Sequence, residues 1–161
     1  MPEISIIPLI KDEEIALRTF ALDIQNNEFK LNLKAEEQPD LLEPLYFYSD
    51  GGFWIAKQGT EIVGSIGLQK LNSETGIMRK FFVKKELRGT IPSVAALLFQ
   101  QFLQQTKELK LKNIFLDTPA VAVASHRFYE KNGFLPVNNY KNLPNGYFFA
   151  DRDSKVYCLT L

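Results

Sequence analysis

Alternating strand-like and helical segments constrain the fold of this chain more than any other feature of its sequence. Residues 53–57 and 62–71 are rich in apolar and β-branched side chains, and the short turn between them contains Gly59, which is typical of a β-hairpin. A third strand-like segment at residues 77–83 is followed by a helix, a strand, a second helix and two closing strands. This order predicts a mixed α/β fold.

Local signals set the expected bounds of the other elements. A first strand is expected at residues 4–8, and Asp12, which stands before two glutamates, is expected to cap the helix that follows. A second helical segment within residues 35–48 is weakened by Pro44. Gly133 is expected to stop a later helix. The later segments are expected as helices at residues 92–109 and 122–132 and as strands at residues 113–117, 134–137 and 155–161.

Composition bounds the domain organisation and the kinds of site. A chain of 161 residues with 45% hydrophobic and 24% charged residues fits one domain over residues 1–161 with a sizeable core. The only cysteine, Cys158, excludes an internal disulfide, and the only histidine, His126, leaves no Cys/His cluster for a metal. We expect His126, beside Arg127 in a helix, to be a surface or half-buried residue and not a base. No apolar run approaches the roughly 18 residues that span a bilayer, so we expect a cytoplasmic protein.

The charge balance argues against a nucleic-acid or membrane partner. Nineteen basic and nineteen acidic residues give a formal net charge of zero, so the overall field that attracts DNA or anionic lipid is missing. Residues 1–50 carry eleven acids and four bases, a sum of −7, and residues 51–161 carry eight acids and fifteen bases, a sum of +7. Either these charges are solvated helix faces, or the first part offers an acidic approach for a cation and the second a basic seat for an anion.

A basic turn between a strand and a helix is the first candidate site. Residues 82–93 run from the third strand through Lys84, Lys85 and Arg88 toward a helix N-terminus. The unpaired N–H groups of a helix N-terminus can hold a phosphate, and the basic side chains would add charge. The alternative is that this turn is only a solvated connection.

The second candidate segment is Ser-His-Arg-Phe-Tyr-Glu-Lys-Asn-Gly-Phe at residues 125–134, which follows a strand at residues 114–118. It resembles the closing motif of the GCN5-related N-acetyltransferase (GNAT) family. The resemblance covers residues 53–137, and the spacing between the basic turn and this motif fits the family as well. It implies a central mixed, splayed β-sheet flanked by helices. A cleft for acetyl-CoA would open between the strands that end at Val83 and Asp117.

The resemblance also implies roles for particular residues. The strand at residues 80–83 would pair its backbone with the pantetheine arm, and the loop at residues 88–94 would bind the pyrophosphate. Tyr129 matches the catalytic tyrosine near the departing sulfur, although it could also be only a packed helix residue. The implied cofactor-binding residues are Phe82, Val83, Arg88, Gly89, Thr90, Ile91, Ser93 and Val94.

Several positions depart from the family pattern. Ile91 and Ser93 stand where the family loop has small residues, and Pro92 between them lacks an N–H group. We therefore expect weaker or differently placed CoA binding. Ile77 stands where many members carry a glutamate base, and Ala122 stands where an asparagine is frequent.

The function that these features imply is transfer of an acetyl group from acetyl-CoA to a primary amine of a small molecule or a peptide by direct attack. Tyr129 would stabilise the leaving thiolate more than protonate it, because the pKa of a tyrosine, about 10, exceeds that of a thiol, about 8.5. The alternative is a noncatalytic ligand-binding or protein-interaction module on the same fold. An RNA-binding role for the segment around Lys107, Lys110 and Lys112 is disfavoured because it lacks interleaved aromatic residues. A homodimer is compatible with the sequence. The candidate bases for the amine are Glu28, Glu36, Glu37 and Glu74.

Overall fold

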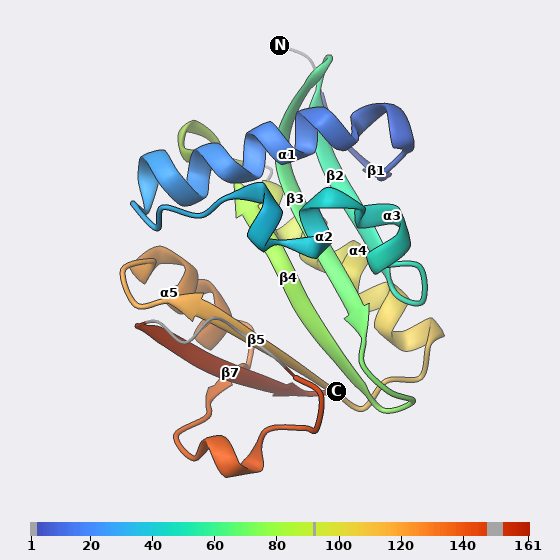
Figure 1. Cartoon of the computed structure of the whole chain (residues 1–161), viewed down its shortest axis with the longest axis vertical. Coiled ribbons are helices and arrows are strands. Elements are labelled where there is room, and N and C mark those ends of the chain that lie inside the picture. The colour runs from blue at the N-terminus through green and yellow to red at the C-terminus, as the bar shows by residue number, and fades with distance from the viewer. Residues whose placement is uncertain (1–2, 92, 148–152) are drawn as a thin grey trace.

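A mixed seven-stranded sheet forms the centre of the computed structural model, which describes residues 3–91, 93–147 and 153–161 (Figure 1). The strand order is β1-β2-β3-β4-β5-β7-β6, and β4 and β5 are the parallel neighbours in an otherwise antiparallel sheet. The strands are β1 (Ile4–Pro8), β2 (Gly52–Gln58), β3 (Glu61–Lys70), β4 (Thr75–Val83), β5 (Asn113–Pro119), β6 (Leu135–Pro136) and β7 (Ser154–Thr160).

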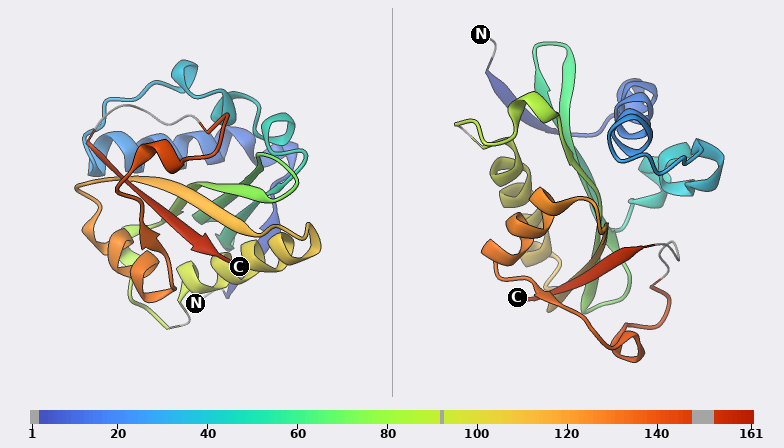
Figure 2. Two further views of the ribbon diagram at one scale, coloured as in Figure 1. Left: turned by 90° about the horizontal axis from the view of Figure 1, so that it is seen from below. Right: turned by 90° about the vertical axis from the view of Figure 1, so that its left-hand side faces the viewer.

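Helices cover both faces of this sheet, as the right-hand view of Figure 2 shows. One face carries α1 (Glu14–Asp23), α2 (Pro39–Leu42) and α3 (Pro44–Phe47), and the other carries α4 (Val94–Glu108) and α5 (Val123–Lys131). Five single turns complete the described chain: η1 (Lys11–Glu13), η2 (Ile24–Glu28), η3 (Ala35–Glu37), η4 (Lys85–Leu87) and η5 (Tyr140–Asn142). The expected fold class, a mixed α/β fold with a splayed central sheet flanked by helices, is confirmed. No helix in the described ranges is long and apolar enough to cross a membrane.

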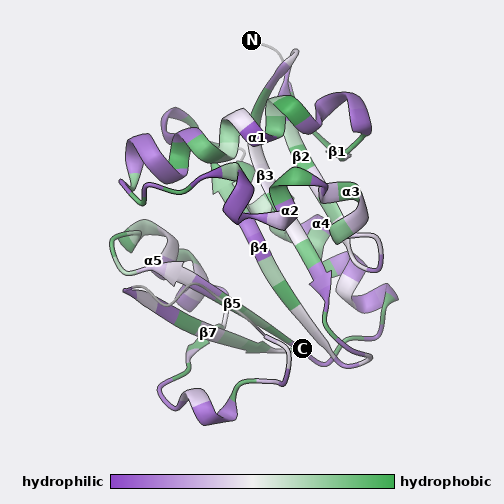
Figure 3. Cartoon of the chain, viewed as in Figure 1, coloured by the Kyte–Doolittle hydropathy of each residue, from purple (hydrophilic) through white to green (hydrophobic). Residues whose placement is uncertain are grey.

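Helix α4 shows how the sequence pattern produces the packing. Its residues Val94, Leu98, Phe102 and Thr106 recur every four positions, and all four are buried, because this spacing places side chains on one face of a helix. Figure 3 shows hydrophobic and hydrophilic residues alternating along the helices. The apolar face of α4 joins β2, β3 and β4 in the main hydrophobic core.

The expected strands and the helices near residues 92–109 and 122–132 are confirmed to within two residues at each end, although Pro92 lies outside the described residues. The expectation that Asp12 caps the first helix is wrong: Asp12 lies inside η1, and α1 begins at Glu14 without a side-chain cap. Residues 35–48 form three short turns instead of one helix, because Pro39 and Pro44 each start a new one.

Gly133 ends α5 as expected. Its φ of +91° lies in the left-handed region, its N–H donates to the carbonyl of Glu130, and the N–H of Phe134 donates to the carbonyl of Tyr129. These two bonds form the usual glycine stop of a helix. They fix the last turn of α5, which carries Tyr129.

Candidate active site

Parallel strands β4 and β5 separate soon after they begin. They pair at only three positions, where Thr75, Gly76 and Ile77 face residues 113–115, and Figure 1 shows them diverging beyond that point. Two cavities open there, the first of about 430 Å³ and the second of about 580 Å³, both within the roughly 300–1,000 Å³ typical of small-molecule sites. The two share the wall residues Phe29, Phe81, Phe82, Ala122, Ser125 and Tyr129.

A bulge bends β4 beside the cavities. Ser65 on β3 pairs with Phe82 and Gly67 pairs with Arg79, so one residue of β3 lies opposite Lys80 and Phe81 together. Lys80 has a φ of +53°, and the hydroxyl of Ser65 donates to its carbonyl at 2.6 Å. A bulge of this kind increases the local twist of a strand. The end of β4 therefore turns away from β5, and Phe82 and Val83 line the first cavity.

The loop after β4 contributes an open edge to the first cavity. Gly89 has a φ of +76°, and nothing lies within 4 Å of the position that a Cβ would take. Ile91 is 99% exposed, so its bulk points into solvent and does not fill the cavity. Ser93 caps α4 by accepting a hydrogen bond from the N–H of Ala96 at 3.1 Å. The first-turn N–H groups of α4, which have no helical partner, thus begin at the cavity wall formed by Ser93 and Ala95.

The structure brings most of the expected cofactor-binding residues to the first cavity, but not all of them. Thr90 does not line it, and its hydroxyl donates to the carbonyl of Leu87 at 2.8 Å. Val94 is buried in the core beneath the cavity. The expected residues that line it are Phe82, Val83, Arg88, Gly89 and Ser93.

All three nitrogens of the Arg88 guanidinium donate hydrogen bonds. Its Nε donates to the carbonyl of Val83 at 2.9 Å, and its two terminal nitrogens donate to the carboxylate of Glu28. Glu28 also lines the first cavity. The charge of Arg88, which was expected to be offered to a phosphate, is therefore paired with a carboxylate on η2, while Lys84 pairs with Glu61.

Tyr129 projects from α5 to the junction of the two cavities. It is only 5% exposed and lines both. Burial, and to a smaller degree the charges of Asp117 and Tyr157, raises the pKa of Tyr129 above its ordinary value. The hydroxyl therefore keeps its proton near neutral pH and can donate a hydrogen bond.

His126 is buried, against expectation. It is 6% exposed, its Nε2 lies 2.9 Å from the carbonyl oxygen of Pro119, and its ring packs 6.1 Å from that of Tyr157. It lines neither cavity. His126 is covered because α5 also packs against β7, through the rings of His126 and Tyr129 on that of Tyr157. The residue holds the β5–α5 connection in place.

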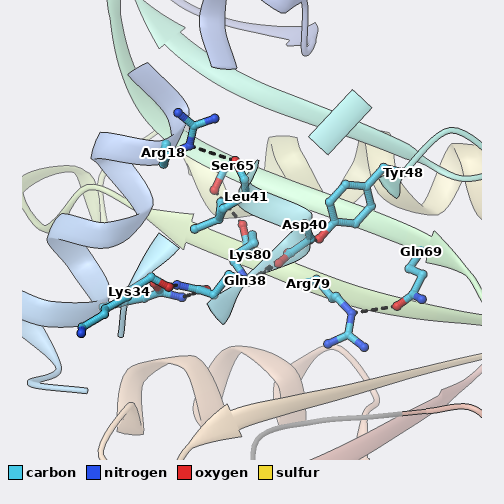
Figure 4. A network of polar contacts seen from close by, with 11 residues as sticks. Arg18, Lys34, Gln38, Asp40, Leu41, Tyr48, Ser65, Gln69, Arg79 and Lys80 are labelled. Atoms are coloured by element: carbon cyan, nitrogen blue, oxygen red, sulfur yellow. Dashed lines mark hydrogen bonds and ion pairs between the residues drawn. The ribbon is translucent and has the colours of Figure 1, made fainter. Parts of the chain in front are cut away.

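Charged and amide side chains line the second cavity, and several of them belong to the network of polar contacts in Figure 4. The ammonium of Lys80 lies 2.9 Å from the carboxylate of Asp40, which also accepts a hydrogen bond of 2.7 Å from the hydroxyl of Tyr48. Arg79 donates from Nε to Gln69 at 2.8 Å. The acidic and basic parts of the sequence therefore do not divide between the two cavities: Asp40 meets Lys80 in the second, as Glu28 meets Arg88 in the first.

The four carboxylates proposed from sequence have different positions. Glu28 pairs with Arg88, and Glu74 forms an exposed ion pair with Lys112 outside both cavities. Glu36 is exposed and lines neither cavity, whereas Glu37 is exposed at the second. Among the residues that the structure describes, no three His, Cys, Asp or Glu side chains cluster as metal ligands would.

Sequence reasoning missed Asp117, which lines the second cavity near the end of β5. Its Oδ1 accepts a hydrogen bond of 2.7 Å from the hydroxyl of Tyr147. A signal was available, because ligands in open α/β sheets bind beyond the carboxyl ends of strands, and Asp117 occupies such an end.

Comparison with known proteins agrees with this geometry. The model of the acetyltransferase (GNAT) family matches residues 19–134. An acetyltransferase from Streptococcus agalactiae shares 33% identity over 98% of each chain with a TM-score of 0.91. A GNAT-family acetyltransferase from Staphylococcus aureus shares 30% identity over 98% of this chain and 99% of its own, with a TM-score of 0.92. The PaiA N-acetyltransferase from Thermoplasma acidophilum, in complex with coenzyme A, has the same fold at 15% identity, with 99% coverage of both chains and a TM-score of 0.72. No curated protein sequence matches this chain.

Proposed function

Because this chain belongs to the acetyltransferase (GNAT) family, we propose that it transfers an acetyl group from acetyl-CoA to a primary amine of a small molecule or a peptide. The observation that carries this proposal is the pair of cavities that meet at Tyr129 between the diverging strands β4 and β5. A two-substrate transfer needs two sites that open on one reacting centre. The first cavity would take the donor and the second the acceptor.

The first cavity suits an anionic, elongated donor. Among the described residues, the part of β4 beyond Ile77 does not pair with β5. The backbone groups along this edge can therefore form hydrogen bonds with the amides of a pantetheine arm. The open position at Gly89 and the N-terminus of α4 favour a diphosphate through main-chain N–H groups. We propose that Phe82, Val83, Arg88, Gly89 and Ser93 hold the donor directly. Thr90, Ile91 and Val94 would then contribute only their main-chain groups.

Acetyl-CoA supplies a thioester, and attack by the amine nitrogen forms a C–N bond while the C–S bond breaks. The side chain of Tyr129 is proposed to donate a hydrogen bond to the departing sulfur. Its raised pKa makes complete proton transfer to a thiolate less favourable than hydrogen bonding. Stabilisation of negative charge by a fixed donor in a buried site is a large contribution in such reactions.

A noncatalytic module is the second candidate. Ile77, at the position where many relatives carry a glutamate, is fully buried, so no carboxylate reaches the cavities from that point of β4. The Glu28 carboxylate on Arg88 would also weaken binding of an anionic donor. Both features are expected of a protein that keeps the acetyltransferase fold but does not catalyse the reaction.

Release of CoA thiol tests the proposal against this alternative. The protein is mixed with acetyl-CoA and a panel of amines that contains a lysine peptide, a peptide with a free N-terminus, a linear polyamine and free amino acids. We expect thiol release that depends on at least one amine and saturates with a donor KM in the usual range of about 1 μM to 1 mM. Donor binding without amine-dependent release would favour the noncatalytic module, and absence of donor binding would overturn the transferase.

A further inference from the structure

Asp117 is a half-buried carboxylate that lines the second cavity and forms no ion pair with a described basic side chain. Asp117 lies on β5 between Leu116 and Thr118, which are both buried, while its own side chain reaches the cavity. Its Oδ1 accepts the hydrogen bond from Tyr147. Within residues 3–91, 93–147 and 153–161, no basic side chain lies within ion-pair distance of it.

The other carboxylates that line the two cavities either form ion pairs or lie exposed to solvent. Asp40 is held by Lys80 and Tyr48, and Glu28 by Arg88 in the first cavity. Glu37 is exposed at the rim of the second cavity. Among the described carboxylates that line the second cavity, Asp117 is therefore the one that is half-buried and forms no ion pair.

Asp117 and Tyr129 face the same space. Both line the second cavity, and the charge of Asp117 contributes to the raised pKa of Tyr129. The groups around the Asp117 carboxylate come from several elements. Tyr129 belongs to α5, and Tyr147 to the segment after η5. Arg79 on β4 has its guanidinium 5.8 Å from the centre of the Tyr147 ring. The register partner on β7, Val156, is apolar.

We propose that Asp117 binds the ammonium group of the acceptor in the second cavity and takes up its proton. The inference rests on the proposed acetyl transfer and adds that the primary amine enters as its cation and gives up its proton to Asp117. The proton moves from R–NH₃⁺ to the Asp117 carboxylate, and the freed lone pair attacks the thioester carbon. The C–N bond forms and the C–S bond breaks. The second nitrogen proton passes to the departing thiolate to give the CoA thiol, and Asp117 returns its own proton to water.

A pH series of kcat/KM distinguishes this role from a structural one. The substrate is a lysine-like amine, whose pKa is about 10.4. If Asp117 binds the ammonium form, wild-type kcat/KM is nearly constant between pH 7 and 8.5, because the ammonium form dominates there. The Asp117→Asn variant must instead use the scarce neutral amine. Its kcat/KM should lie about 100-fold or more below wild type at pH 7 and rise about tenfold per pH unit.

Two controls keep the outcomes separate. Asparagine can still accept the hydrogen bond from Tyr147, and acetyl-CoA binding by Asp117→Asn, measured calorimetrically, should equal that of wild type if the fold is intact. Glu108→Gln removes an exposed carboxylate outside both cavities and should leave the pH series unchanged. Parallel series for wild type and Asp117→Asn would overturn the inference while leaving the transferase in place. Absence of transfer by wild type would overturn the proposed function itself.

Discussion

The guanidinium of Arg88 forms a two-pronged ion pair with the carboxylate of Glu28, sixty positions earlier in the chain, and one of its hydrogen bonds measures 2.7 Å. Both side chains line the first cavity. An anionic donor that enters this cavity meets the positive charge of Arg88 together with the negative charge of Glu28. The pair therefore weakens the field that attracts the donor.

Removal of the Glu28 charge should tighten donor binding. Glu28→Gln leaves Arg88 anchored to the carbonyl of Val83 and frees its charge for a phosphate, so we expect the Kd for acetyl-CoA to fall about three- to tenfold at low salt. The gain should shrink as added salt screens the charges. Calorimetric titration measures both effects. Glu61→Gln, which breaks the exposed pair with Lys84 outside the cavity, is the control, and an unchanged or higher Kd in Glu28→Gln would contradict the argument.

Loss of the Tyr129 hydroxyl should slow the reaction without weakening donor binding. Tyr129→Phe removes a buried donor at the junction of the cavities, and we expect kcat to fall about 10- to 100-fold while the Kd for acetyl-CoA changes less than about twofold. Tyr157→Phe is the matched control, because its ring packs 5.7 Å from that of Tyr129 but lines neither cavity. Equal kcat in wild type and Tyr129→Phe would show that the hydroxyl has no part in the chemistry.

Local patterns predicted the elements of this fold well, and contacts distant in sequence were harder to predict. Gly133 and Tyr129 belong to one short motif, so spacing alone placed them at the end of a helix. The pairing of Asp40 with Lys80 joins segments forty positions apart, and Arg88 meets Glu28 across sixty. No pattern among neighbouring residues predicts contacts between segments so far apart in the sequence. His126 was misjudged for a related reason, since its burial depends on β7, which lies about thirty positions later in the chain.

The fold should lose stability in alkaline solution. Burial raises the pKa of Tyr48, Tyr129 and Tyr147 in the folded protein, while the unfolded chain loses these protons near pH 10. Above that pH the unfolded state binds fewer protons, so the free energy of unfolding falls as pH rises. Each tyrosine contributes a slope of about 1 kcal/mol per pH unit between pH 10 and 11. When the free energy of unfolding is measured in urea at several pH values between 10 and 11, its decrease per pH unit should be smaller in Tyr129→Phe by about that amount. An identical pH dependence in the two proteins would refute the prediction.

Breaking the Lys80–Asp40 pair should destabilise the fold, because both side chains are mostly buried. Their exposed fractions are 13% and 8%, so Asp40→Asn leaves an ammonium group without its counter-charge, and we expect a loss of about 2–4 kcal/mol in urea unfolding. Adding Lys80→Met to Asp40→Asn should restore at least half of the lost free energy of unfolding. Glu74→Gln, which breaks an exposed pair, should cost less than about 0.5 kcal/mol. A double variant as unstable as Asp40→Asn alone would contradict this explanation.

Calorimetric titration of acetyl-CoA into wild type and Ala95→Trp tests the donor site most directly. Ala95 lines the first cavity on the first turn of α4 and is partly exposed, so an indole there would fill space proposed for the donor. We predict saturable binding of one donor per chain by wild type and at least about tenfold weaker binding by Ala95→Trp. Equal binding by the two proteins, or no binding by wild type at millimolar donor, would contradict the assignment of this cavity.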